Sequence, residues 1–148
     1  MAENSKRERI IQNVVDSLRT LPWVKTLTRE QAGDPGDLDA YAQTQFPVLA
    51  TVGQLPQPRE ERRCGRAKEF LSDLDVELYL YALNAATPDA GISSMLDDIW
   101  AAIFADRTRG GLAMDTSVLS DVAKAVYPPY VAVALIVRVT YIHDSTGI

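Results

Sequence analysis

Residues 73–82 alternate between two kinds of side chain, and this pattern constrains the fold more than any other feature of the chain. Every second residue is apolar: Leu74, Val76, Leu78, Leu80 and Ala82. The residues between them are acidic or aromatic. A two-residue period predicts a β-strand with one buried face. The chain therefore needs a second layer to cover that face.

The next segment, residues 92–104, changes to a helical period. Its apolar residues recur at steps of three and four: Ile92, Met95, Leu96, Ile99, Trp100, Ile103 and Phe104. This spacing predicts an amphipathic helix whose apolar side lies on another element, and the preceding strand is the nearest candidate. Gly110 and Gly111 can then adopt a left-handed conformation that ends the helix and returns the chain toward the sheet.

Shorter elements are expected on both sides of this unit. A first helix is predicted that Asn4 or Ser5 can cap, with Glu8 completing a capping box for Ser5, and it ends before Pro22. Strands are predicted at 23–28 and 46–53, and the polar residues 31–45 between them indicate a surface excursion. Residues 114–125 fit a helix or a strand, and their β-branched content favours a strand.

The last predicted strand, residues 130–142, has two different faces. Its odd positions are large and apolar, whereas Ala132, Ala134 and Ile136 on the other face are small or apolar until Arg138. Such a strand is expected to be covered on both faces in its first half, by its own chain or by a neighbouring subunit. The order of elements predicts one α+β domain over residues 1–148, with an antiparallel or mixed sheet of about four to five strands packed by two main helices.

A charged segment at about residues 56–70 separates two predicted strands, so it is expected to be a long hairpin arm or a mobile loop. It contains five of the fifteen Lys and Arg residues: Arg59, Arg62, Arg63, Arg66 and Lys68. Two interpretations stay open. The charges serve solubility, or they form a docking surface, because loops on a rigid scaffold often carry recognition.

Composition limits the class of protein. The net charge of -5 argues against a surface for non-specific DNA binding. A single cysteine, Cys64, cannot form an intramolecular disulfide, which favours a cytosolic protein. The longest apolar run, residues 131–137, is far shorter than the roughly 20 residues of a membrane-spanning helix. A soluble protein is therefore expected.

Catalytic chemistry has one weak candidate. Asp73, Asp75 and Glu77 project from one face of a strand and could hold Mg²⁺ as in a nuclease. The lysine of restriction-type nucleases is missing after Glu77, and a solvated strand end is the preferred interpretation. One histidine, His143, and one cysteine exclude the usual zinc sites, and no glycine-rich nucleotide motif is present. No catalytic, cofactor or metal site is predicted.

Several short segments, taken in order, resemble one family. They are Leu21-Pro22, Phe46-Pro47-Val48, Val76-Glu77-Leu78-Tyr79-Leu80, Leu96-Asp97-Asp98-Ile99-Trp100, Ala105-Asp106, Gly110-Gly111-Leu112-Ala113-Met114-Asp115 and Val137-Arg138-Val139-Thr140-Tyr141. They are similar to the tail terminator proteins of long-tailed bacteriophages, the group that includes tail-completion proteins and the lambda minor tail protein U. The resemblance covers nearly the whole chain.

This resemblance implies an α+β subunit that assembles into a ring, by family expectation a hexamer, on the end of the tail tube. The ring would stop tube polymerisation and present a surface to the head-tail connector, or neck protein. It implies a virion protein of the tail or neck, assembled in the cytoplasm of the host bacterium. Genomic DNA would pass through the lumen without specific binding, and no catalytic residue, cofactor or membrane is implied.

The expected contacts between copies involve the charged arm and two apolar patches. One patch is Tyr79 and Tyr81, and the other is Ala132, Ala134 and Ile136; at least one of them is expected to be closed by an adjacent subunit or a loop. Two alternatives stay open: another head-tail joining, neck or tube protein, and a magnesium-dependent nuclease that uses Asp73, Asp75 and Glu77.

Overall fold

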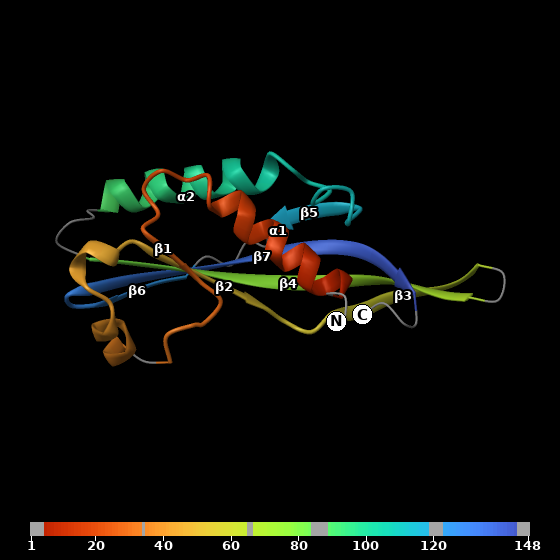
Figure 1. Ribbon diagram of the computed structural model, residues 1–148, viewed down its shortest axis with the longest axis horizontal. Helices are drawn as coiled ribbons and strands as arrows, with labels where there is room; N and C mark the ends of the chain where they lie inside the picture. The colour runs from red at the N-terminus through yellow and green to blue at the C-terminus, as the bar shows by residue number, and fades with distance from the viewer. Residues whose placement is uncertain (1–4, 34, 65–66, 84–88, 119–122, 145–148) are drawn as a thin grey trace.

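A computed structural model describes residues 5–33, 35–64, 67–83, 89–118 and 123–144. Two helices lie on one face of a seven-stranded mixed sheet (Figure 1). The elements in chain order are α1 (Lys6–Leu18), β1 (Thr26–Thr28), the 3-10 helices η1 (Pro35–Ala40) and η2 (Gln43–Gln45), β2 (Val48–Gly53), β3 (Gln57–Cys64), β4 (Ala67–Leu83), α2 (Asp89–Phe104), β5 (Asp115–Val118), β6 (Ala123–Tyr127) and β7 (Tyr130–Asp144).

Two long antiparallel strands form the centre of the sheet. All 15 residues of β7 pair with β4, from Glu69 opposite Asp144 to Leu83 opposite Tyr130. β2 and β3 follow one another along the other edge of β4, and β5 and β6 both pair with β7. Only the short β1 pairs in parallel, with β2.

The predicted α+β class with a mixed sheet is confirmed, but the predicted four to five strands are too few. Two features account for the difference. The charged segment forms a strand of its own, β3, and residues 114–125 contribute to two short strands in place of one. The preference for strand over helix in that second segment is confirmed.

The main core lies between the sheet and the two helices. Its sheet residues come from the alternating apolar positions of β4 and β7: Leu74, Val76, Leu78, Leu80, Val133, Leu135, Val137 and Val139. Its helix residues include Ile10, Ile11, Val14 and Leu18 of α1 and Ile92, Ile99 and Ile103 of α2. Burying one such side chain typically contributes roughly 1.5–3 kcal/mol, so this face supplies most of the driving force for folding.

The start of α1 follows the sequence prediction in part. The Ser5 hydroxyl accepts a hydrogen bond from the backbone N–H of Glu8 at 3.1 Å, as an N-cap should. The Glu8 carboxylate, however, pairs with Arg29 at 2.6 Å, so the second half of the predicted capping box is replaced by an ion pair. The Arg29 guanidinium hydrogen bonds to this carboxylate and lowers the pKa of Glu8.

The end of α2 differs from the prediction. The helix ends at Phe104, before the glycine pair, so Gly110 and Gly111 do not terminate it. They do adopt the expected left-handed conformation, with φ of 69° and 86°, in the loop that leads to β5. The buried Arg109 closes the helix instead, because its guanidinium donates to the carbonyl oxygens of Ile103 and Asp106.

Candidate assembly interface

The face of the sheet that points away from α1 and α2 contains five of the ten residues proposed for assembly. The register places Tyr81 opposite Ala132, Tyr79 opposite Ala134 and Glu77 opposite Ile136. We call this surface the open face; its residues are Asp73, Asp75, Glu77, Tyr79, Tyr81, Ala132, Ala134, Ile136, Arg138 and Thr140. The two apolar patches predicted from sequence are therefore a single surface.

One end of the open face is covered by the chain's own residues 31–46, which contain η1 and η2 (Figure 1). Leu38 and Phe46 pack there with Tyr81 and Tyr130 in a second, smaller apolar cluster. The rings of Phe46 and Tyr130 stack with their centroids 5.5 Å apart. This intramolecular contact leaves Tyr81 only 5% exposed.

Sequence reasoning missed this covering segment. Residues 31–45 are mostly polar and were expected to form a surface excursion, yet Leu38 is buried and Tyr41 packs against the same cluster. Leu38 and Tyr41 are three residues apart, which places them on one side of a 3-10 turn. That spacing was the one available signal.

A hollow of about 280 Å³ lies beside the covering segment on the open face. The predicted residues Tyr79, Tyr81, Ala132 and Ala134 line it. Seven other residues, which sequence reasoning did not single out, complete its lining: Gln31, Ala32, Gly33, Leu38, Lys124, Ala125 and Tyr127. We refer to this site as the hollow.

The two tyrosines of the hollow have a defined arrangement. The rings of Tyr79 and Tyr81 are nearly parallel, at 6°, with centroids 6.3 Å apart. The Tyr81 hydroxyl accepts a hydrogen bond from the backbone N–H of Ala32 at 3.2 Å, and the Tyr79 hydroxyl donates to the Glu77 carboxylate. Burial raises the pKa of both tyrosines, and the bond to Glu77 raises the pKa of Tyr79 further.

The three carboxylates of the open face have separate partners. Asp75 accepts two hydrogen bonds from the Arg138 guanidinium, at 2.9 and 3.2 Å. Asp73 accepts a hydrogen bond from the Thr140 hydroxyl at 2.8 Å, and Glu77 accepts one from Tyr79. Within the described residues, no three His, Cys, Asp or Glu side chains are grouped so that they could hold a metal ion. The arrangement gives the nuclease alternative no support.

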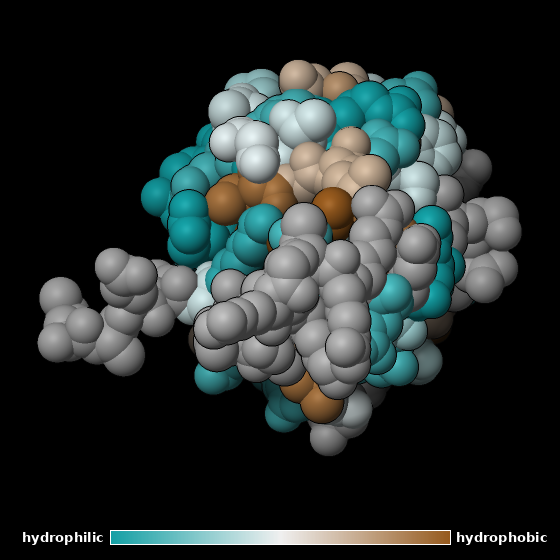
Figure 2. All heavy atoms as spheres, turned by 90° about the vertical axis from the view of Figure 1, so that its right-hand side faces the viewer, coloured by the Kyte–Doolittle hydropathy of each residue, from teal (hydrophilic) through white to brown (hydrophobic). Residues whose placement is uncertain are grey.

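The charged segment forms a hairpin arm. β3 pairs with the first part of β4 from Gln57 opposite Asp73 to Cys64 opposite Ala67. β7 accompanies β4 only as far as Glu69, so the outer part of the arm consists of two strands among the residues that the structure describes. The arm projects beyond the helices (Figure 1), and the described surface seen from that end is mainly hydrophilic (Figure 2).

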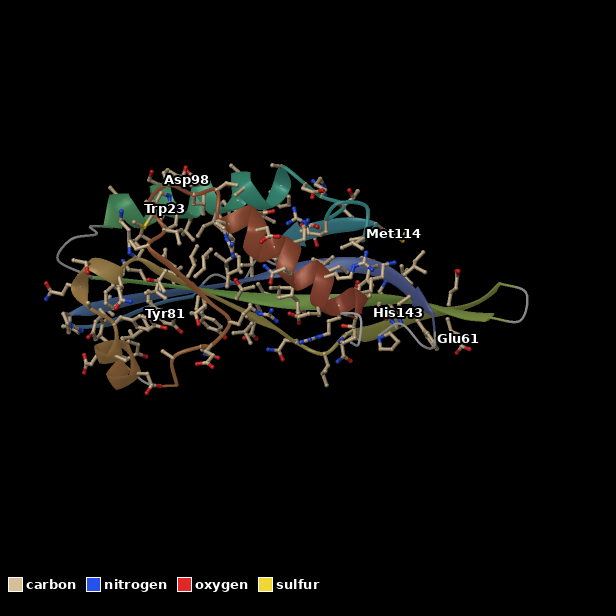
Figure 3. All side chains as sticks on the ribbon, viewed as in Figure 1. Trp23, Glu61, Tyr81, Asp98, Met114 and His143 are labelled. Carbon is tan, nitrogen blue, oxygen red and sulfur yellow. The ribbon has the colours of Figure 1, made fainter. Side chains whose placement is uncertain are left out.

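The structure describes some of the five basic residues proposed for the arm more fully than others. The Arg59 side chain is 59% exposed and lies 3.4 Å from Asp73. Arg62 and Arg63 lie on β3, and Lys68 lies on β4. The structure describes the backbone pairing of these three residues but not their side chains. Arg66 falls outside the described residues. Tyr81 of the hollow and Glu61 of the arm lie near opposite ends of the molecule (Figure 3).

No protein-family model matches this chain, and a search of the curated proteins found no match. Among the described residues, neither α1 nor α2 has the length and apolar content to cross a membrane. The function is therefore inferred from the surfaces of the chain and from the sequence resemblance.

Proposed function

We propose that this chain is a virion structural protein, a tail terminator that forms a ring on the end of the phage tail tube. The ring stops tube polymerisation and provides the joint to the head-tail connector. The observation that carries the proposal is the contrast between a helix-covered face and an open face on which Tyr79, Ala132, Ala134 and Ile136 remain partly exposed. Apolar surface beside a hollow is typical of a protein contact site.

The geometry meets the needs of a ring subunit. A closed ring requires heterologous contacts, in which two different surfaces of each copy meet. The arm, which contains Glu61, and the hollow, which Tyr81 lines, offer two different surfaces near opposite ends of the molecule (Figure 3).

The charge of the chain fits a ring through which genomic DNA passes. The net charge is -5, and like charge disfavours lasting contact with phosphates. The partners proposed here are further copies of the chain, a hexamer by the sequence resemblance, together with the tail tube protein and the connector. The proposed location is the tail or neck of the virion, after assembly in the bacterial cytoplasm.

The direct test adds the purified protein to polymerising tail tubes and measures tube length by electron microscopy. Capped tubes of restricted length are expected. Ala134→Arg, which places a charge in the hollow, should abolish capping, whereas Ala101→Arg on the exposed side of α2 should leave it intact. Tubes of unchanged length with bare ends would exclude a terminator, and polymerisation of the protein alone would indicate a tube protein.

The nuclease alternative has its own test. The protein is incubated with DNA and Mg²⁺, and no cleavage is expected because Asp73, Asp75 and Glu77 have separate hydrogen-bond partners. DNA cleavage that disappears in Asp75→Ala would overturn the structural assignment.

A further inference from the structure

Two consecutive stretches of the sequence carry opposite charge. Residues 30–58 contain four acidic residues and no Lys or Arg: Glu30, Asp34, Asp37 and Asp39. Residues 59–69 contain five basic residues and three Glu. Residues 31–46 cover one end of the open face, while the arm extends from the other end (Figure 1). Complementary charge at opposite ends favours head-to-tail association and disfavours pairing of like ends.

The acidic residues lie close to the hollow. A second cavity, of about 220 Å³, shares Gln31, Ala32, Leu38 and Tyr81 with the hollow and is lined also by Glu30 and Asp37. Lys124 is the single basic residue among the described residues that line either cavity. Among these described residues, the lining of the hollow itself therefore contains one basic and no acidic side chain, and the two carboxylates lie in the cavity beside it.

Two aromatic side chains of the hollow are accessible to an arginine side chain. Tyr79 is partly exposed and Tyr127 is exposed, whereas the ring of Tyr81, parallel to that of Tyr79, is buried. Guanidinium groups stack on aromatic rings and pair with carboxylates, and the arm sequence has four arginines between residues 59 and 66. The small side chains of Ala132 and Ala134 leave the space that an incoming strand would need.

The arm cannot reach the hollow of its own chain. Ala67 lies in the outer part of the arm and Tyr81 lies in the hollow, and the continuous strand β4 joins them. At roughly 3.3 Å per residue, these two positions are about 46 Å apart. Because β4 is paired along this length, the arm cannot fold back. Any arm seated in a hollow must come from another molecule.

We propose that the β3–β4 arm of one copy docks in the hollow of a second copy, with Arg62 and Arg63 of the arm near Tyr79, Tyr127 and the acidic residues Glu30 and Asp37 beside the hollow. The inference deepens the ring proposed above and rests on it. Each added subunit leaves one arm and one hollow free until the ring closes, which is the property of a heterologous contact.

The chain offers its own cross-linking probe. Cys64 is the only cysteine and lies at the outer end of β3. Ala132→Cys introduces a thiol into the hollow, and Ala101→Cys on the exposed side of α2 is the matched control. Under mild oxidation, Ala132→Cys should give at least ten times more disulfide-linked oligomers than Ala101→Cys, with Cys64 identified in the linked peptide by mass spectrometry. Adding Cys64→Ser should remove them.

A charge exchange tests the chemistry of the contact. In the Ala132→Cys background, Arg62→Glu with Arg63→Glu should lower cross-linking at least fivefold. This arm variant is then mixed with a second chain that carries Ala132→Cys, Cys64→Ser, Glu30→Lys and Asp37→Lys. The reversed charges should restore cross-linking between the two chains. Equal cross-linking in Ala132→Cys and Ala101→Cys, or no loss on charge reversal, would overturn the docking proposal.

Running the cross-linking with and without tail tubes separates the two proposals. Capped tubes with no link between Cys64 and the hollow would leave the terminator function standing and overturn arm docking. Specific links without capping would support docking and remove the terminator assignment. Neither links nor capping would reject both.

Discussion

The two faces of the sheet differ although the same two strands supply both. On β7, Leu135 faces the helices and is 1% exposed, whereas its neighbour Ile136 on the open face is only partly buried. Aliphatic side chains from α1 and α2 fill one face. Tyrosines, alanines and hydrogen-bonded charges make up the other, and only one end of it is covered by the chain.

The comparison shows how a partly apolar surface can remain compatible with water. Charged side chains on the open face pair with each other, as Asp75 does with Arg138, and the partly exposed alanines contribute little apolar area each. The open face therefore retains space and chemistry for a partner, while the helix-covered face provides the stability of the fold. Four predictions test this division.

The largest difference in the free energy of unfolding is expected between alanine variants of two adjacent residues, Leu135 and Ile136. Leu135→Ala creates a cavity in the main core and should lower the free energy of unfolding by roughly 2–5 kcal/mol. Ile136→Ala, on the open face, should cost about 1 kcal/mol because its side chain is partly exposed and no helix covers it. Urea denaturation of both variants gives the comparison. Equal losses would mean that the open face is a core in its own right.

Removal of the buried Arg109 side chain should lower the free energy of unfolding almost as much. Arg109→Met removes the donors to the carbonyl oxygens of Ile103 and Asp106 and should cost roughly 2–3 kcal/mol. Arg107→Met is the matched control, since it removes an exposed ion pair with Asp115 and a cation–π contact with Phe104 and should lower the free energy of unfolding much less. Thermal and urea unfolding would measure both. Similar losses in the two variants would refute the role of Arg109 in closing α2.

The decrease in the free energy of unfolding at acid pH should depend on Asp106. The backbone N–H of Gly110 hydrogen bonds to this carboxylate and holds its pKa below the ordinary value of 3.8. The ionised carboxylate therefore stabilises the fold above that pH, and this contribution is lost as pH falls through the lowered pKa.

Asp106→Asn tests this dependence. It should cost on the order of 1 kcal/mol at pH 7, where the wild-type carboxylate is ionised, and the difference from wild type should shrink toward pH 2. Unfolding free energies measured from pH 7 to pH 2 would show it. A constant difference across this range would contradict the assignment.

The smallest change in the free energy of unfolding is expected for a variant of the open face. Tyr79→Phe removes the hydroxyl that donates to Glu77 but keeps the ring, so unfolding should change by less than about 1 kcal/mol. Because burial raises the pKa of Tyr79 above its ordinary value of 10.0, its neutral form stabilises the fold below pH 10, and this contribution is lost at higher pH.

Alkaline titration at 295 nm checks this expectation. The wild-type protein should contain several tyrosines that ionise above pH 10, because the pKa values of Tyr79, Tyr81, Tyr130 and Tyr141 are all raised, and Tyr79→Phe should contain one fewer. Tyr41→Phe, which changes a partly exposed tyrosine on the covering segment, is the control and should retain the late transition. Identical titration curves for wild type and Tyr79→Phe would rule out the buried environment of this phenol.

Periodicity along the chain was enough to predict much of the fold. Alternation marked the long strands β4 and β7, and the three-to-four spacing of Ile92, Ile99 and Ile103 marked α2. The same alternation placed Tyr79, Tyr81, Ala132, Ala134 and Ile136 on faces separate from the core. These features were predictable because they depend on neighbours within one element.

Other features could not be derived this way. The covering segment was missed because polar residues surround Leu38 and Tyr41, so no period of useful length was present. The end of α2 was misassigned because Arg109 reaches back to Ile103 through its side chain, a contact that composition does not reveal. The count of strands depended on pairing between segments far apart in sequence.

The sequence by itself determined the α+β class, the two apolar stripes that build the main core, and the opposite charge of residues 30–58 and 59–69. Tertiary structure alone decided that the two predicted patches form one surface, since the register sets Tyr81 beside Ala132, and a shift of one residue would turn each side chain to the other face. It also decided that Leu38 and Tyr127 meet these residues around one hollow. The physical reason is that periods are local, whereas register and covering contacts depend on the packing of the whole chain.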